Sequence, residues 1–201
     1  MSQVTYKIVT IACIVEGHGE VQALPRLLHR IASSVDPGTQ LILPTPYRIN
    51  RSRLVRAETL EDVVRTQGDR VTGAGGVLVL IDADDDCPAE LGPELLTRAR
   101  AARPDRKVAV VLAKREFEAW FLAAGSSLAG RRGLPDEFES PPDPETVRDA
   151  KGRLGSRNPH RPYRPTSDQA ALANIFDMKV AREKAPSFDK FWREAERLIR
   201  G

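Results

Sequence analysis

The sequence predicts an α/β fold: a mostly parallel β-sheet flanked by helices, followed by a helical C-terminal extension. Near-continuous runs of apolar, largely β-branched residues are typical of strands that are buried on both faces of a parallel sheet. Three such runs occur, at Lys7–Val15, Val77–Ile81 and Lys107–Ala113. A stretch with helical spacing follows each run, and alternation of strand and helix is the pattern of parallel α/β sheets.

The first strand, Lys7–Val15, is followed by the acidic turn 16–20 and then by a helix. Apolar residues recur at helical spacing in that helix. Pro25 is compatible with a helix that begins near Val21, because first-turn amides lack an intrahelical partner. The region Gln40–Ile49 is predicted to be an edge or bulged strand, since its two prolines cannot donate to a sheet ladder.

An amphipathic helix is expected at Glu58–Arg70, before the central strand Val77–Ile81. Another helix, Ala89–Arg103, follows that strand and ends before a proline. After the last strand, a helix at Lys114–Ala124 carries large apolar side chains. These elements complete an α/β domain that we place at residues 1–125.

Beyond this domain the chain becomes rich in glycine and proline. The expected elements are a short helix, a loop, a helix that starts at a capping box and a final amphipathic helix, at Glu145–Arg153, Gly155–Pro165, Thr166–Phe176 and Ser187–Arg200. The capping box pairs Thr166 with Gln169, three residues on. We expect residues 126–201 to form a helical extension that packs on the same domain.

The 201-residue chain is long enough for one sizeable core, and its 41% hydrophobic and 29% charged residues indicate a globular protein in water. No apolar run approaches the roughly 20 residues that span a bilayer, and the N-terminus lacks a signal-peptide pattern, so we expect a cytoplasmic protein without membrane contact. Cys13 and Cys87 are expected to be buried thiols. The net charge of +3 is only mildly basic, so the distribution of charge matters more than its sum.

Carboxylates gather where the predicted strands end. Two glutamates follow the first strand and four aspartates follow the central one: Glu16, Glu20, Asp82, Asp84, Asp85 and Asp86. In open parallel sheets, ligands bind at the carboxyl ends of the strands. So many like charges repel one another unless a cation lies among them, and oxygen ligands suit Mg²⁺. A solvated acidic turn that caps the next helix is the alternative.

Several familiar sites do not match these residues. The dinucleotide-binding fingerprint fails because Gln22 stands at its third glycine position, and no Gly-Lys-Ser/Thr phosphate loop occurs in the chain. An EF-hand loop fails because Cys87 replaces the turn glycine and Pro93 replaces the bidentate glutamate. A phosphatase of the haloacid-dehalogenase type is a remote alternative, because its Asp-x-Asp normally belongs to the first strand of the chain.

A strand that ends in Glu-Gly-x-x-Glu, with a later strand that ends in Asp-x-Asp, resembles the Toprim domain of topoisomerases, bacterial primases and overcoming-lysogenization-defect (OLD) nucleases. The segments VEGHGEVQALPRLL, LIDADDDCP and KREFEAWFLA together are similar to the Toprim-like family called domain of unknown function 4276. The resemblance covers most of the chain and implies a Toprim-like, Rossmann-like sheet. It also implies a role in phage defence beside a partner ATPase, which the residues themselves do not show.

The same resemblance implies a set of metal ligands. Glu16 matches the Toprim glutamate, and Asp82 and Asp84 match the Asp-x-Asp ligands. Glu20 matches the second acidic position of OLD-type nucleases. Glu118 matches a further acidic ligand after the last strand, more loosely, because the residue two positions earlier is equally acidic. An ordinary surface glutamate is the alternative for Glu118.

Phosphodiester cleavage needs a positioned nucleophile and neutralisation of the charge that develops on the phosphate. One or two Mg²⁺ (or Mn²⁺) ions held by these carboxylates would supply both. Glu16 alternatively acts as a general base. Together with Glu16 and Asp82, Lys114 and Lys151 form the expected catalytic set, because either lysine could contact the scissile phosphate. An ordinary surface lysine is the alternative for each.

A basic stretch follows in the C-terminal third of the chain, where residues 151–164 include no aspartate or glutamate. The nucleic-acid-binding residues expected here are Lys151, Arg153, Arg157, Arg161, Tyr163 and Arg164. Such a loop can follow a phosphate backbone and stack a base on its tyrosine. A solvated, arginine-rich loop is the alternative. The smaller basic group Arg51, Arg53 and Arg56 has the same two interpretations.

Three functions are consistent with these patterns. The leading hypothesis is a metal-dependent nuclease or related phosphodiesterase that acts on nucleic acid. The second is a non-catalytic nucleic-acid- or partner-binding subunit that works only with an ATPase. The third is a metal-dependent phosphohydrolase of a small molecule. The basic stretch favours nucleic acid over the third function, and the intact acidic set favours catalysis over the second.

Overall fold

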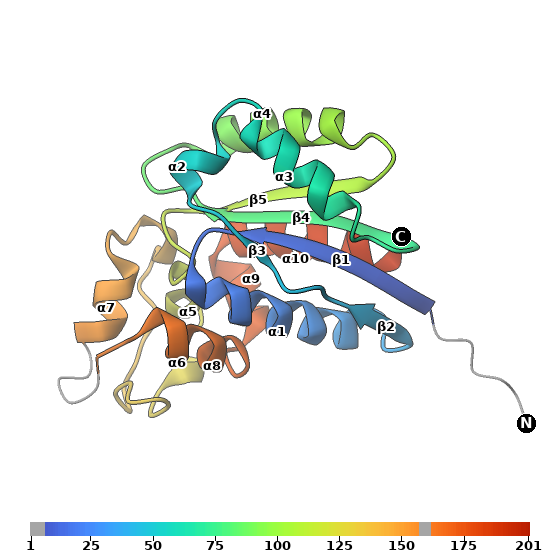
Figure 1. Cartoon of the computed structure of the whole chain (residues 1–201). Helices are drawn as coiled ribbons and strands as arrows, with labels where there is room; N and C mark the ends of the chain where they lie inside the picture. The colour runs from blue at the N-terminus through green and yellow to red at the C-terminus, as the bar shows by residue number, and fades with distance from the viewer. Residues whose placement is uncertain (1–6, 157–161) are drawn as a thin grey trace, which may run out of the picture.

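In the computed structural model, which describes residues 7–156 and 162–201, a parallel β-sheet forms the centre of the molecule (Figure 1). The strands are β1 (Lys7–Val15), β2 (Thr39–Ile42), β3 (Tyr47–Arg48), β4 (Ala74–Asp82) and β5 (Lys107–Ala113). Their order is β2-β1-β4-β5, and β3 pairs with the end of β1. All of these pairs are parallel, so the carboxyl ends of the strands lie at one edge. The predicted α/β class is confirmed.

The apolar runs are buried on both faces of the sheet, as predicted. Along β1, Val9 and Ile11 pack into the core on one face, whereas Ala12 and Ile14 pack into the core on the other. The predicted edge strand Gln40–Ile49 is divided into β2 and β3, and its two prolines stand between them. Side chains of β1 alternate between the two faces of the sheet because a strand has a two-residue period.

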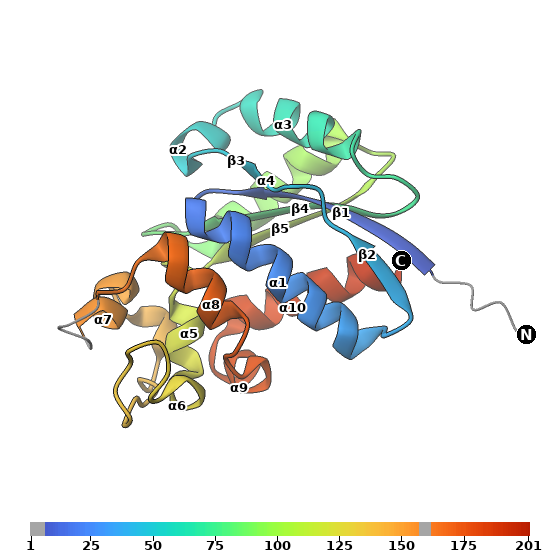
Figure 2. The same ribbon diagram turned by 60° about the horizontal axis from the view of Figure 1, so that its bottom comes forward.

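Helices cover both faces of the sheet (Figures 1 and 2). The helices α1 (His18–Val35) and α10 (Pro186–Arg200) pack on one face, and α3 (Thr59–Gly68) and α4 (Pro88–Ala102) on the other. α10 lies against β4 and β5, although it is far from both along the chain. Because α1 begins at His18 rather than near Val21, Pro25 falls in its second turn and not in its first.

The rest of the chain forms short helical segments. Their bounds are α2 (Arg51–Leu54), α5 (Ala119–Ala123), α6 (Gly125–Leu128), the 3₁₀ turn η1 (Pro144–Thr146), α7 (Ala150–Ser156), the π-helix η2 (Pro165–Gln169), α8 (Ala170–Ala173) and α9 (Met178–Lys184). The C-terminal segments share a core with α1 and α10. In it, the Trp120 ring lies 5.1 Å from that of Phe188 and 5.2 Å from that of Phe191. This aromatic packing ties the turn after β5 to α10.

Two further predicted helix starts were wrong because hydrogen bonds hold the backbone in another conformation. The helix predicted at Lys114–Ala124 is reduced to α5, because the preceding turn directs the Phe117 N–H to Asp82 Oδ1, at 2.7 Å. The capping box at Thr166 does not form. Instead η2 has Arg164 at its N-cap, and the Arg164 N–H donates to Asp168 Oδ2 at 2.8 Å.

The segment before η2 also differs from its prediction. The short helix expected at Glu145–Arg153 is replaced by η1 and α7, which are separate elements. α7 extends to Ser156, so residues 155 and 156 of the predicted loop are helical, whereas residues 157–161 of that prediction lie outside the described residues. Cys13 is buried as predicted, whereas Cys87 is exposed, because it precedes α4 on the rim of the sheet rather than lying within it.

Within the described parts of the chain, every helix is too short or too polar to cross a membrane.

Gly76 lies on β4 where β5 and α10 approach closely. A Cβ added there would lie 2.1 Å from the carbonyl oxygen of Lys107 and 2.9 Å from Leu198 Cδ2. We predict that Gly76→Ala lowers the free energy of unfolding by about 2–4 kcal/mol, because the neighbouring backbone cannot give way. Gly38→Ala is the control, since its Cβ would lie 3.9 Å from Asp36 Oδ1. Urea denaturation measures both variants, and equal stability would contradict this close packing.

Candidate functional site

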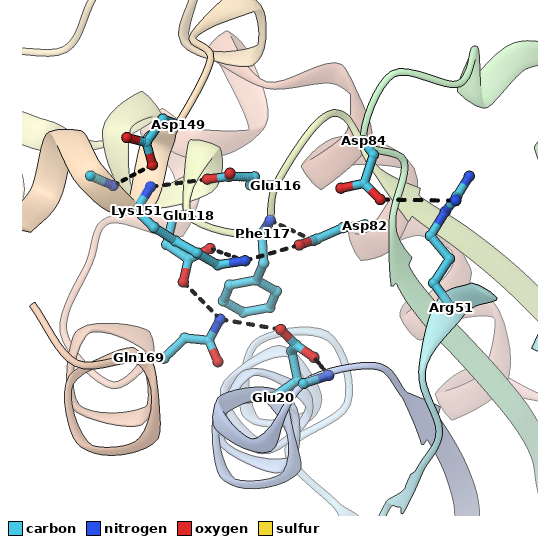
Figure 3. Close-up of polar contacts among 12 residues, drawn as sticks. Glu20, Arg51, Asp82, Asp84, Glu116, Phe117, Glu118, Asp149, Lys151 and Gln169 are labelled. Carbon is cyan, nitrogen blue, oxygen red and sulfur yellow. Dashed lines mark hydrogen bonds and ion pairs between the residues drawn. The ribbon is translucent and has the colours of Figure 1, made fainter. Parts of the chain in front are cut away.

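The carboxyl edge of the sheet gathers the acidic residues that the sequence singled out (Figure 3). Glu16 directly follows β1, and Asp82 is the last residue of β4. Asp82 is in register with Ala113, the last residue of β5, so the turn after β5 brings Glu118 to the same edge. Glu20 reaches this edge from the first turn of α1. The topology therefore brings together carboxylates from three separate parts of the chain.

Glu20, Asp82 and Glu118 form a buried group, called here the inner cluster, with exposed fractions of 6%, 9% and 0%. Burial raises the pKa of Asp82 well above its ordinary value, and the charges of Glu20 and Glu118 raise it further, against an opposing effect of Lys151. Burial also raises the pKa of Glu118 to about 7. Both shifts have the sign expected for carboxylates that lose water and face like charges.

Lys151, on α7, is the cation of the inner cluster. Its Nζ lies 3.4 Å from Asp82 Oδ2 and 3.8 Å from Glu118 Oε2. Its backbone N–H donates to Glu116 Oε2 at 2.9 Å, which fixes α7 beside the turn after β5. Glu118 is therefore the glutamate of that turn that faces the inner cluster, and Glu116 holds α7 in place. The side chain of Lys151 is 40% exposed, so it reaches the cluster from solvent.

Gln169 and Tyr163 complete the inner cluster, and the sequence did not predict their contacts. The buried Gln169 Nε2 donates to Glu118 Oε1 at 3.2 Å and to Glu20 Oε1 at 3.4 Å. Tyr163 O–H donates to the same Glu118 Oε1 at 2.9 Å. Gln169 fits only because it faces Gly19, where a Cβ would lie 2.0 Å from Gln169 Oε1. No local signal identifies Gln169, since its position depends on η2 packing against α1.

Glu16, Asp84 and Arg51 form a second group beside the inner cluster, called here the outer group. Arg51 Nη1 lies 3.9 Å from Asp84 Oδ2, and Arg51 also binds Asp86. Burial raises the pKa of Glu16, the charges of Asp84 and Glu20 raise it further, and the Arg51 N–H and guanidinium lower it. The outer group is thus in electrostatic contact with the inner cluster through Glu16.

The turns after β4 and β5 hold strained backbone. Asp84 and Arg115 both have positive φ, at 51° and 62°, a conformation that non-glycine residues rarely adopt. The Asp84 N–H donates to the carbonyl oxygen of Arg115 at 3.0 Å, and Arg115 Nη1 lies 2.9 Å from Asp85 Oδ1. The two turns therefore support each other, and strain of this kind is typical of functional sites.

The other predicted site residues are more scattered. Lys114 is exposed and lines a cavity next to Asp84, outside the inner cluster. Arg153 lies half-buried on α7, and Arg164 is exposed at the N-cap of η2. Arg157 and Arg161 lie outside the described residues. In the described part of the basic stretch, Lys151 and Tyr163 therefore lie at the acidic edge of the sheet, and Arg153 and Arg164 lie around that edge.

The acidic side chains at this edge are suitable ligands for a hard divalent cation, because all of them bind through oxygen. Two of their atoms, Glu16 Oε2 and Glu118 Oε2, are buried without a hydrogen bond in the described structure. As placed, however, no three Asp, Glu, His or Cys side chains among residues 7–156 and 162–201 are grouped as metal ligands. Lys151 Nζ instead contacts Asp82 and Glu118. A bound cation would have to share or replace the charge of Lys151.

Comparison with protein families identifies the chain. The family model "Domain of unknown function (DUF4276)" matches residues 15–196, so the chain belongs to this family. The match includes every residue of the inner cluster and of the outer group. No curated protein and no solved structure matches the chain.

Glu118 makes the stability of the protein depend on pH. With a pKa of about 7 when folded and about 4.3 when unfolded, it holds a proton only in the folded state between these values. Its contribution therefore favours folding at low pH and is lost as the pH rises through about 7. We predict that, in EDTA, this group makes the free energy of unfolding of wild type fall by about 2 kcal/mol as the pH rises from about 5 to about 8. Glu118→Gln should remove most of that fall.

Urea denaturation at the two pH values measures this effect. The exposed Glu183 on α9 is the control, and Glu183→Gln should keep the pH dependence of wild type. If Glu118→Gln lost as much stability as wild type over the same range, the raised pKa of Glu118 would be wrong.

Proposed function

We propose that this protein is a divalent-metal-dependent phosphodiesterase that cuts nucleic acid. The inner cluster carries the proposal, because buried carboxylates with raised pKa values serve no evident purpose in packing and require a positive charge. The similarity of the Glu-Gly-x-x-Glu and Asp-x-Asp strand ends to Toprim domains supports the same chemistry. On that resemblance, the protein acts in phage defence, together with a partner ATPase.

Glu20, Asp82 and Glu118 would hold one Mg²⁺ or Mn²⁺, and Glu16 with Asp84 would complete that site or hold a second ion. Such a cation neutralises charge on the phosphate and lowers the pKa of a bound water. Asp82 is the central ligand, because its Oδ1 is oriented by the Phe117 N–H and its Oδ2 faces Lys151. Gln169 orients the glutamates by donating to both Glu20 and Glu118.

The other residues have roles that follow from their placement. Lys151 is half-exposed, so its ammonium can leave Asp82 and Glu118 and bind a phosphate oxygen of the substrate. As an alternative to binding a metal, Glu16, whose buried Oε2 accepts no described hydrogen bond and whose pKa is raised, can take a proton from the attacking water. Arg51 holds Asp84 and Asp86 in position.

The surroundings favour a strand of nucleic acid over a small molecule. A hollow of about 660 Å³ runs along α7, and its charged lining residues are Arg148, Arg153 and Asp149. The same helix carries Lys151 of the inner cluster, so a phosphate backbone bound in the hollow would lie along the helix that supplies this lysine. Arginines that contact phosphates bind without regard to sequence. The hollow thus suits a long anionic substrate rather than a single phosphate ester.

A second candidate function is a non-catalytic subunit that binds nucleic acid or a partner ATPase. One observation favours it: Lys151 already compensates Asp82 and Glu118, so the inner cluster is satisfied electrostatically without a metal. Cleavage experiments separate the two candidates directly.

We predict cleavage of labelled DNA or RNA that requires Mg²⁺ or Mn²⁺ and is abolished by EDTA. Asp82→Asn should reduce the rate by about 100-fold or more, because it removes the central ligand while keeping the hydrogen bond from Phe117. Asp62→Asn, at an exposed position of α3, is the matched control and should cut like wild type. If wild type bound single- and double-stranded DNA and RNA but cut none of them, the subunit function would replace the enzyme.

Lys151 should act on metal binding and cleavage in opposite directions. Lys151→Met removes a cation that competes for Asp82 and Glu118, so we predict Mn²⁺ binding that is tighter by about tenfold together with slower cleavage. Calorimetry and the cleavage assay measure the two effects, with the exposed Lys179→Met as the control. Unchanged Mn²⁺ affinity in Lys151→Met would contradict competition at the inner cluster.

A further inference from the structure

A separate cavity of about 610 Å³ is lined by Asp84 and by none of the residues of the inner cluster. It is bounded by the turn after β4, the amino-terminal half of α4, the end of β5 and the start of α10. Its volume falls within the range of roughly 300–1,000 Å³ that is typical of small-molecule sites. Asp84 lines this cavity and also belongs to the outer group, so the two sites share a wall.

The inner wall of the cavity is apolar and carries no large side chain. Its apolar lining residues include Leu112, Pro88, Pro93 and Pro186. Gly92 faces the open space, because a Cβ added there would meet only Leu112 Cδ1, at 3.9 Å. Flat apolar surfaces of this kind suit a planar ring and do not suit a hydrated ion.

The rim of the cavity carries charges of both signs, and each of its acids has a partner within the protein. Asp84 and Asp86 contact Arg51, and Asp85 contacts Arg115. Glu145 accepts hydrogen bonds from the N–H and the O–H of Ser187.

Lys114, which follows β5, and Lys190, on α10, also line the cavity. Lys114 is exposed, and the Lys190 side chain is 42% exposed, with Glu194 3.9 Å away. Two lysines beside an apolar lining form a site for a ligand that is anionic at one end and planar at the other.

We propose that this cavity binds one nucleotide, with its base against Leu112 and the prolines and its phosphate at Lys114 and Lys190. That the nucleotide belongs to the strand being cut rests on the proposed function, and the shared wall at Asp84 supports it. A base can enter such a cavity only when it is unpaired, so the proposal favours single strands, ends or frayed duplexes as substrates.

The test fills the cavity and measures binding in EDTA, where the proposed cleavage does not operate. Gly92→Leu places a side chain in the open space within α4, and Ala101→Leu, exposed on the same helix, is the matched control. Lys190→Ala is a second variant that removes only an exposed charge. The probes are deoxyadenosine 5′-monophosphate, deoxyadenosine and a short single-stranded oligonucleotide that contains the fluorescent base 2-aminopurine.

We expect Gly92→Leu to weaken binding of the monophosphate, or the fluorescence response of the oligonucleotide, by about tenfold or more, with Ala101→Leu like wild type. Lys190→Ala should weaken binding of the monophosphate but not of deoxyadenosine. A response to the oligonucleotide alone assigns the site to the substrate strand, and a response to the monophosphate alone assigns it to a free nucleotide.

The proposal is overturned if wild type binds none of the probes, or if Gly92→Leu and Lys190→Ala both bind them like wild type. Metal-dependent cleavage by wild type alongside that result would leave the proposed function intact. Conversely, binding that is lost in Gly92→Leu, without cleavage by wild type, would support the nucleotide site and reject the nuclease.

Discussion

The repulsion among the buried carboxylates at the carboxyl edge of the sheet is the constraint on which this structure depends. Parallel strands bring Glu20, Asp82 and Glu118 together, and burial makes their charges costly. Lys151, from α7, compensates part of this negative charge. Arg51 plays the corresponding part for Asp84 and Asp86, from the opposite side of the sheet edge. Electrostatic compensation by residues remote in sequence therefore couples the sheet to the segments around it.

The C-terminal segments are accordingly part of the site rather than an addition to the sheet. The contact of Trp120 with Phe188 and Phe191 places α10 beneath the turn after β5. Packing against α1 and α8 holds η2, from which Gln169 reaches both glutamates of the inner cluster. The π-helical geometry of η2 agrees with a role in the site, since such turns occur frequently at functional sites. Membership of the DUF4276 family extends over these segments, because the match runs to residue 196.

The sequence predicted the parts of the structure that depend on local patterns. Near-continuous apolar runs placed β1 and β5 with their observed bounds, and the break from apolar to acidic residues located Asp82 at a strand end. It could not place Gln169 or Tyr163, since their contacts depend on how η2 packs against α1. Gln169 was assigned instead to a capping box, which is a local interpretation of the same residues. The cavity beside Asp84 was likewise beyond prediction, because α4, β5 and α10 form it together.

The central claim is that the inner cluster binds a divalent cation, and titration of Mn²⁺ followed by electron paramagnetic resonance tests it most directly. The full chain at about pH 8 should remove free Mn²⁺ from solution in a saturable manner, because the raised pKa of Glu118 leaves that residue ionised there. Asp82→Asn should lose this binding while remaining folded. Absence of saturable binding in wild type, or equal binding in Asp82→Asn, would contradict the claim and leave Lys151 as the permanent cation of the site.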